Sequence, residues 1–294
     1  MEPQVSRPPE NQASENQASE TRPSESKLSE TRPPEIRAAV IGGGSWGTAF
    51  ARLLAGTGLA TELICRRPEQ AEAINSAHRN PDYLTDIDLP EGATASSFAE
   101  NRLGESSLVV VAVPSKAFRS VISSLAASIN PEASVLSLTK GLEPETLKRM
   151  SEVLAEELSA AATTAAKIAV LSGPNHAEEV ALDIPTATTI AAADNDLARV
   201  LQALVSTPAF RVYINSDLIG VEFCAATKNV IALAAGMSDG LGFGDNTKAS
   251  LLTRGLAEMA RLGAAMGARP ETYYGLAGMG DLIATCTSRH SRNR

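Results

Sequence analysis

The chain has 294 residues, of which 44% are apolar, and this is enough for two domains of ordinary size with packed cores. Its formal net charge of −8 argues against a nucleic-acid-binding surface but leaves room for a local basic pocket. Three cysteines without metal-ligand spacing, no apolar run judged long enough to span a bilayer, and no N-terminal secretory signal predict a cytoplasmic protein without a metal site.

Residues 1–35 differ in composition from the rest of the chain. They repeat ENQASE and SETRP, and a glutamate stands at every fifth position from Glu10 to Glu35. Proline, serine and glutamate dominate, so the segment cannot bury enough apolar surface to offset the entropy lost on ordering. We predict a disordered tail without chemistry.

Residues 36–215 alternate apolar strand patterns with helical patterns. Alternation of this kind predicts an α/β fold, a Rossmann-type and mostly parallel sheet with helices on both faces, forming a dinucleotide-binding domain. The predicted strands are 38–41, 61–65, 107–113, 134–139 and 168–172, with weaker candidates at 186–192 and 211–214, and the predicted helices are 48–56, 69–77, 116–127 and 143–161.

Residues 216–294 are helical in pattern throughout. Helices are predicted at 218–235, 248–266 and 278–285, with Asp245 and Asn246 placed as N-cap residues of the second. The chain then stops inside the polar run TSRHSRNR, which is not a typical end for a helical domain. We therefore predict an all-helical substrate domain that is incomplete.

The stretch GGGSWGT follows the first predicted strand and precedes the first predicted helix. Gly42, Gly44 and Gly47 have the spacing G-x-G-x-x-G in the strand–turn–helix setting that this motif requires. In such a motif the first glycine permits a tight turn, the second admits a pyrophosphate, and the third lets the helix pack closely. The phosphates would lie at the free N–H groups of the helix N-terminus.

The second predicted strand ends at Arg66 and Arg67. In NAD-selective folds an acidic residue usually stands here and binds the ribose 2′-hydroxyl. Guanidinium groups instead favour the 2′-phosphate of NADPH, so we expect NADPH, with NADH possible. Two solvated loop arginines are the alternative interpretation.

Two further strand ends carry polar residues toward the same edge of the sheet. Lys140 ends one strand, and its alternative interpretation is a surface residue. The turn Gly173-Pro174-Asn175-His176 ends the next, where backbone groups face the ligand crevice of such folds. His176 is a candidate general base, although a histidine in a polar turn is more often structural.

Lys228 lies within an otherwise apolar helical stretch. Burying an ammonium group is costly unless it is paired or functional. Desolvation and a neighbouring cation would both lower its pKa and make it competent for proton transfer near neutral pH. The alternative is a lysine that extends its ammonium to the surface.

Taken together, these stretches resemble the bacterial-type glycerol-3-phosphate dehydrogenase [NAD(P)+] family. The resemblance covers nearly all of residues 36–294. It is carried by GGGSWGTAFA, VPSKAF, LTKG, SGPNHAEEV, ATKNVIALAAG, LGFGDNTKA, TRGLAEM, GLAGMGDLIATCTS and SRNR, in this order.

The resemblance implies reversible, NAD(P)H-dependent reduction of dihydroxyacetone phosphate to sn-glycerol 3-phosphate, which supplies the glycerophospholipid backbone. It implies that Lys228 transfers the proton, that Lys140 contacts cofactor and substrate, and that Asp281 orients Lys228. The implied substrate-binding residues are Lys140, Gly173, Asn175, Lys228, Asp281, Thr285, Ser291, Arg292 and Asn293. The implied cofactor-binding residues are Ser45, Trp46, Arg66, Arg67, Lys140, Ala177 and Arg292, in addition to the three glycines.

Two departures from the family pattern leave alternatives open. Asn175 stands where the family usually has Ser or Thr, and family members continue beyond SRNR. There are two competing hypotheses. The chain is a truncated cofactor-binding fragment without turnover, or it is another two-domain hydroxyacid dehydrogenase with a catalytic lysine. The partner expected is a small phosphorylated substrate, without nucleic acid or a membrane span, and a homodimer is possible because apolar helical faces remain uncovered.

Overall fold

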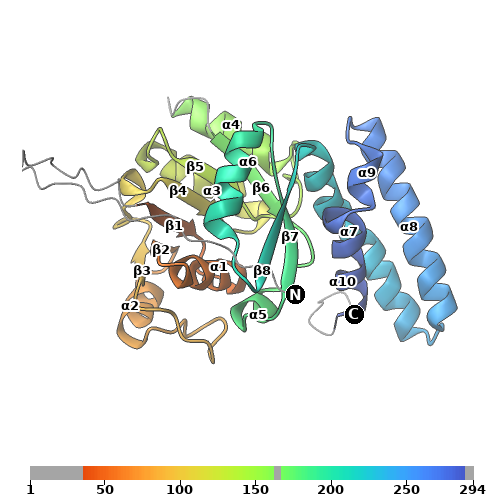
Figure 1. Cartoon of the computed structure of the whole chain (residues 1–294), viewed down its shortest axis with the longest axis horizontal. Helices are drawn as coiled ribbons and strands as arrows, with labels where there is room; N and C mark the ends of the chain where they lie inside the picture. Colours follow the sequence, from red (N-terminus) through yellow and green to blue (C-terminus); the bar gives the residue numbers. More distant parts are fainter. Residues whose placement is uncertain (1–35, 162–166, 289–294) are drawn as a thin grey trace, which may run out of the picture. The chain divides into compact units, whose positions relative to one another are not determined.

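A twisted eight-stranded sheet dominates the computed structural model, which describes residues 36–161 and 167–288 (Figure 1). Within these residues the strand order is β3-β2-β1-β4-β5-β6-β7-β8. The strands are β1 (Arg37–Ile41), β2 (Ala60–Cys65), β3 (Ala93–Ser97), β4 (Leu108–Val111), β5 (Ser134–Ser137), β6 (Lys167–Ser172), β7 (Thr186–Ala192) and β8 (Phe210–Asn215). The predicted tail, residues 1–35, lies outside the described residues.

The sheet is parallel from β3 to β6, β7 runs antiparallel to β6, and β8 is parallel to β7. Strand β1 pairs with β2 on one side and β4 on the other, with Ile41 opposite both Ile64 and Val111. The chain order thus reverses between β1 and β4, and ligands bind at the carboxyl ends of strands at such a point. The predicted Rossmann-type, mostly parallel fold is confirmed.

Two hydrophobic cores lie on opposite faces of the sheet because side chains alternate along each strand. Val40 packs into one core with Phe50 and Leu201, and Ile41 packs into the other with Phe118. The first core is covered by α1 (Ser45–Gly56), α2 (Pro68–Ala77), α5 (Ala177–Ala181) and α6 (Asn195–Val205), and the second by α3 (Ser115–Leu125) and α4 (Met150–Ala160).

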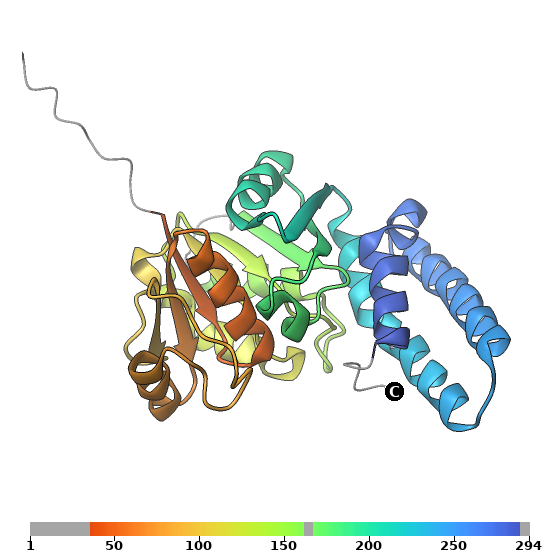
Figure 2. The same ribbon diagram turned by 60° about the horizontal axis from the view of Figure 1, so that its bottom comes forward.

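The remaining elements are helical and follow β8. They are α7 (Leu218–Gly240), α8 (Asp245–Ala265), α9 (Pro270–Tyr273), the π-helical turn η3 (Leu276–Gly280) and α10 (Asp281–Thr287). Their own core contains Cys224, Leu256, Met259 and Tyr273. Figure 2 shows them gathered beside the β7–β8 side of the sheet, and α7 contacts both β6 and β7. Sheet and helices belong to one compact unit that starts at Ile36.

Most predicted elements are present, with some differences. Strand β3 and helices α5, α6 and α9 are not predicted, and the helix predicted at 278–285 is divided between η3 and α10. The helix predicted from residue 143 begins only at Met150, because the preceding segment forms a bridge between Leu142 and Arg149 and Leu147 adopts a left-handed backbone with φ 59°. Helix α8 begins at Asp245 with Gly244 as its N-cap, so the predicted capping by Asp245 and Asn246 is wrong.

Helix α7 also corrects one sequence-based statement. It is long and apolar enough to span a bilayer by length and composition, with a mean hydropathy of 1.5 over 18 residues, although no such run was expected. Half of that window is buried inside the molecule, as in the core helix of a globular protein. The absence of a membrane span stays a prediction, as does the domain division at residues 215/216, which falls between β8 and α7.

Candidate active site

The turn after β1 lies so close to neighbouring backbone that a side chain would not fit at Gly42 or at Gly47. Gly42 has φ 120°, and a Cβ there would overlap the carbonyl oxygen of Ala112. A Cβ at Gly47 would overlap the carbonyl oxygen of Gly42, so the helix α1 can pack on the turn only with glycine at this position. A Cβ at Gly44 would meet nothing within 4 Å, which leaves open space where a pyrophosphate would approach.

The N-terminus of α1 is suited to an anion. Gly44 is its N-cap residue, no side chain of the described residues caps it, and its first turn, beginning at Ser45, contains no acidic residue. The backbone N–H groups there and the positive end of the helix dipole favour phosphate. The Trp46 ring packs edge-on against Phe50 at 5.6 Å, and its buried Nε1 has no hydrogen-bond partner among the described residues. These features fit a dinucleotide.

A buried polar network supports the turn from behind. The amide of Asn80, fully buried, donates to the carbonyl oxygen of Gly43 at 3.0 Å and to Thr48 Oγ1 at 2.7 Å. Gln70 Nε2 donates to the same carbonyl at 2.8 Å and to Asn80 Oδ1 at 3.2 Å. Sequence reasoning missed this network, because Asn80 lies in a polar stretch that gives no sign of burial.

The two arginines after β2 have different surroundings. Arg67 forms an ion pair with Asp82, whereas Arg66 is exposed and has no hydrogen bond or ion pair among the described residues. A guanidinium without a partner at the end of β2 is free to meet a ribose 2′-phosphate. Both arginines are exposed, so the alternative of two solvated loop arginines stays open.

A cluster of two lysines and one aspartate, in which Lys228 and Asp281 are buried and Lys140 is partly buried, lies where α7, α10 and the loop after β5 meet. Lys228 Nζ, from α7, donates to Asp281 Oδ1 at 2.5 Å and to Thr285 Oγ1 at 2.7 Å. Lys140 Nζ donates to the other carboxylate oxygen, Asp281 Oδ2, at 2.9 Å. Since the Lys228 side chain is only 7% exposed, it does not extend to the surface.

Lys140 is also held from the opposite side, by the turn after β6. Its Nζ donates to the carbonyl oxygen of Gly173 and to Asn175 Oδ1, both at 2.9 Å. The Asn175 amide in turn donates to Thr188 Oγ1 at 3.2 Å. Both polar ends of Asn175 are thus engaged within the protein. Lys140 is a member of this cluster, and its interpretation as a surface residue is wrong.

The electrostatics of the cluster suit proton transfer. Burial and the neighbouring Lys140 ammonium lower the pKa of Lys228 to about 8, and the Asp281 carboxylate opposes this shift. The protonated and neutral forms of Lys228 are therefore close in free energy near neutral pH. A general acid or base is most effective when its pKa lies near the working pH.

Of the remaining predicted site residues, some lie in the described part of the chain and some lie outside it. Ala177 is the first residue of α5, and His176 is the N-cap residue of that helix. The residues predicted to bind the substrate phosphate, Ser291, Arg292 and Asn293, lie outside the described residues. Their placement stays a prediction.

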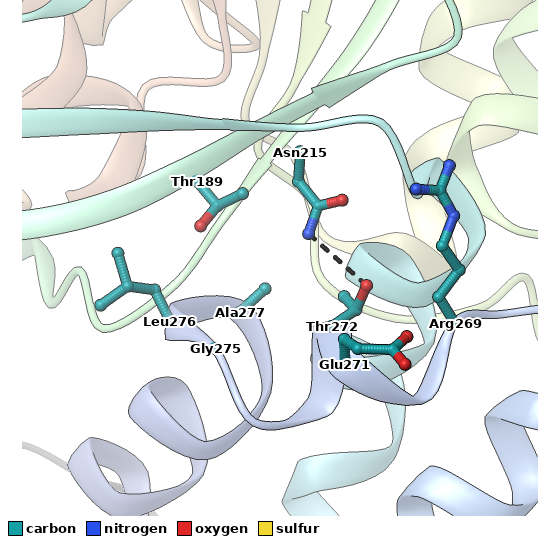
Figure 3. A pocket seen from close by; sticks show the side chains of 8 residues that line it. All are labelled: Thr189, Asn215, Arg269, Glu271, Thr272, Gly275, Leu276 and Ala277. Carbon is teal, nitrogen blue, oxygen red and sulfur yellow. Dashed lines mark hydrogen bonds between the residues drawn. The ribbon is translucent and has the colours of Figure 1, made fainter.

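A separate cavity of about 410 Å³ lies between β7, β8 and the segment from α9 to η3 (Figure 3). Both polar and apolar residues line the cavity. On one side of it the amide of Asn215 donates to Thr272 Oγ1 at 3.5 Å. The lining residues are Thr189, Asn215, Arg269, Glu271, Thr272, Gly275, Leu276 and Ala277, and none of them is a predicted site residue.

The fold is of the Rossmann type and is followed by helices. Together with a glycine turn of the dinucleotide-binding kind and a buried lysine of lowered pKa, it defines the class of NAD(P)-dependent oxidoreductases. The chain belongs to the NAD-dependent glycerol-3-phosphate dehydrogenase family. The family model described as its N-terminus matches residues 37–198, and the one described as its C-terminus matches residues 217–294.

Individual relatives agree with this assignment. The chain is 50% identical over 257 residues to "Glycerol-3-phosphate dehydrogenase [NAD(P)+]" of Shouchella clausii, covering 87% of this chain and 75% of that protein. It is 52% identical over 258 residues to the protein of the same name from Parafrankia sp., covering 88% and 76%. The crystal structure of glycerol-3-phosphate dehydrogenase from Coxiella burnetii superposes with a TM-score of 0.81 at 38% identity, covering 89% of this chain and 78% of that one.

Proposed function

We propose that the chain is an NAD(P)-dependent glycerol-3-phosphate dehydrogenase that reversibly reduces dihydroxyacetone phosphate to sn-glycerol 3-phosphate, the backbone of glycerophospholipids. Membership of the family supports the reaction. The observation that carries the mechanism is the pair of ammonium groups, Lys228 and Lys140, that share the carboxylate of Asp281.

The glycine turn and α1 hold the cofactor. Gly42, Gly44 and Gly47 would admit the pyrophosphate, the N–H groups near Ser45 and Trp46 would bind it, and Ala177 and Lys140 would contact the rest of the cofactor. The bound nicotinamide supplies or accepts the hydride. Because Arg66 is free to bind a 2′-phosphate, we expect NADPH to be preferred, with NADH accepted.

Lys228 transfers the proton to and from the substrate oxygen. In the reducing direction its ammonium donates a proton to the carbonyl oxygen of the substrate, and in the oxidising direction its neutral amine removes the proton from the hydroxyl. Asp281 and Thr285 fix the direction of Nζ. The positive charge of Lys140 stabilises the negative charge that develops on the substrate oxygen.

The substrate is bound by groups around the two lysines. Gly173 contributes from the turn after β6, and Asn175 acts by holding Lys140 as well as by facing the substrate. The phosphate group is assigned to Ser291, Arg292 and Asn293, whose hydroxyl, guanidinium and amide donors suit a dianion.

A homodimer in the cytoplasm is the expected state of the protein. Exposed apolar residues recur at helical spacing along one side of α7, namely Val230, Leu233 and Met237, and the C-cap residue Leu241 continues the series. A second copy that covers this side would give a particle of twice the chain mass of 30.7 kDa, which sedimentation measures directly.

The activity is tested by mixing the purified chain with NADPH and dihydroxyacetone phosphate and following NADPH absorbance. We expect absorbance to fall and sn-glycerol 3-phosphate to accumulate in equal amount. Cofactor binding without turnover would contradict the proposal and favour a cofactor-binding fragment. Turnover only with ketoacids, or with hydroxyacids when NADP⁺ is supplied in place of NADPH, would favour a different dehydrogenase.

A further inference from the structure

The loop between α2 and β3 places a carboxylate against one of the two arginines of the cofactor site. Asp82 pairs with Arg67, and their side chains are 38% and 53% exposed. The neighbouring Arg66 has no such partner among the described residues. One of the two guanidinium groups is therefore neutralised before any ligand arrives.

The position of Asp82 is fixed by the network behind the glycine turn. Its backbone N–H donates to Asn80 Oδ1 at 3.0 Å, and the Asn80 amide donates to the carbonyl oxygen of Gly43 at 3.0 Å. Since Asn80 is fully buried, these bonds attach Asp82 to the turn itself. The ion pair with Arg67 thus forms at a defined place.

The pair also lies close to the cofactor crevice. A Cβ at Gly43 would stand 2.7 Å from the sulfur of Cys65, the residue that ends β2. Burial raises the pKa of the Cys65 thiol to about 11, and the charges of Arg67 and Asp82 act on it in opposite directions, Arg67 lowering it and Asp82 raising it. Both charges are thus near the turn that receives the nucleotide.

We propose that Asp82 is a specificity-determining residue that limits the preference for NADPH over NADH. It retains Arg67 in an ion pair, so only Arg66 is free for the 2′-phosphate. The inference rests on the proposed role of Arg66 in 2′-phosphate binding. A site with two free guanidinium groups would bind NADPH more strongly and gain nothing for NADH.

The test is calorimetric titration of NADPH and NADH in the absence of substrate, so that no turnover is needed. Asp82→Asn removes the charge with little change in shape. We expect NADPH to bind about threefold to tenfold more tightly, with NADH binding changed less than about twofold. Asp88→Asn is the matched control, because Asp88 forms a comparable ion pair with Arg79 near the same loop and should leave both affinities unchanged.

A double substitution separates the restraint of Arg67 from direct repulsion. In an Arg67→Ala background, Asp82→Asn should no longer improve NADPH binding. If NADPH binding still improves in that background, Asp82 does not act by restraining Arg67. If Asp82→Asn alone leaves the ratio of NADPH affinity to NADH affinity unchanged, the proposal is wrong. Retained NADH binding shows that each variant is folded.

Failure of the proposed function gives a different result. If the parent binds both nucleotides but does not reduce dihydroxyacetone phosphate, the activity is wrong and the effect of Asp82 is still measurable. If Arg66→Ala leaves NADPH binding unchanged, the premise about the 2′-phosphate fails and the role of Asp82 fails with it.

Discussion

The glycine turn and the lysine cluster are built in opposite ways. The turn consists of consecutive residues between β1 and α1, and its shape follows from glycines that allow backbone to touch backbone. The cluster joins side chains far apart in sequence: the residue numbers of Lys228 and Asp281 differ by 53, and those of Lys140 and Asp281 differ by 141. Cofactor binding can therefore be inferred from a short motif, whereas the acid–base group depends on the tertiary fold.

The two regions also use different electrostatics. The turn presents partial charges of backbone N–H groups, which do not titrate. The cluster contains two ammonium groups around a single carboxylate, and the pKa of Lys228 is displaced toward neutrality. We therefore expect variants of the cluster to change rate and its pH dependence, and variants of the turn to change cofactor affinity.

The largest effect is expected for Lys228→Ala. Loss of the proton-transfer group should lower kcat by about 10²–10⁴-fold and leave the Kd of NADPH within a few-fold of the parent. Steady-state kinetics and cofactor titration measure the two quantities. Lys248→Ala is the control, since Lys248 is also ion-paired, with Asp239, but lies outside the cluster. If Lys228→Ala also abolished NADPH binding, the role of Lys228 would be structural. The lysine cluster and the glycine turn would then no longer differ in whether they affect rate or cofactor affinity.

The reciprocal change is made in the turn. Gly47→Ala places a methyl group into the carbonyl oxygen of Gly42, and overlap of this kind costs about 1–3 kcal/mol. NADPH affinity should fall at least about tenfold, because the turn must shift. Gly56→Ala is the control, since its Cβ would meet nothing within 4 Å at the end of α1. Gly44→Ala, which also meets no protein atom, should weaken NADPH binding without lowering thermal stability, and unchanged binding in both turn variants would contradict the assignment.

The pH profile distinguishes the two neighbours of Lys228. The reducing direction requires protonated Lys228, so its kcat/KM should decline as pH rises through about 8. Asp281→Asn removes a charge that raises this pKa, and the decline should move to lower pH. Lys140→Met removes a charge that lowers it, and the decline should move to higher pH. Shifts of equal sign in the two variants would contradict the arrangement of charges.

A smaller effect than that of Lys228→Ala is expected for Arg66→Glu. The substitution should lower the ratio of kcat/KM for NADPH to that for NADH by about tenfold, because a carboxylate repels the 2′-phosphate and accepts a ribose hydroxyl. Arg254→Glu makes the same charge change on the exposed surface of α8 and should leave the ratio unchanged. An unaltered ratio in Arg66→Glu would place the 2′-phosphate elsewhere.

Local patterns predicted the elements of the sheet better than the contacts within the site. Buried apolar runs such as 38–41 and 107–113 have few alternatives to strands, but β3, with the sequence ATASS, has no large apolar side chain by which a strand is recognised. Helix 143–161 was predicted too long, since the pattern does not show that Glu143 instead forms an ion pair with Arg119.

The site was only partly predictable for a similar reason. The spacing of Gly42, Gly44 and Gly47 indicates a turn by itself, and the polarity of Lys228 in an apolar helix indicates a special role. No local pattern shows that Lys140 reaches Asp281 or that Asn80 is buried. These contacts depend on how distant segments pack, and Asp281 was identified by family resemblance alone.

The π-helical turn before α10 takes up one extra residue without changing the register of the carboxylate. Gly280 N donates to the carbonyl oxygen of Gly275 at 3.1 Å, an i→i+5 bond that includes one more residue than an α-helical turn would. Removing one residue, such as Met279, would let the segment wind as ordinary α-helix and leave Asp281 in nearly the same direction about the axis, because a π turn fits its extra residue into nearly the same rotation. The carboxylate would stay beside both ammonium groups, whereas the same deletion within a regular α-helix would rotate the residues after it by about 100°.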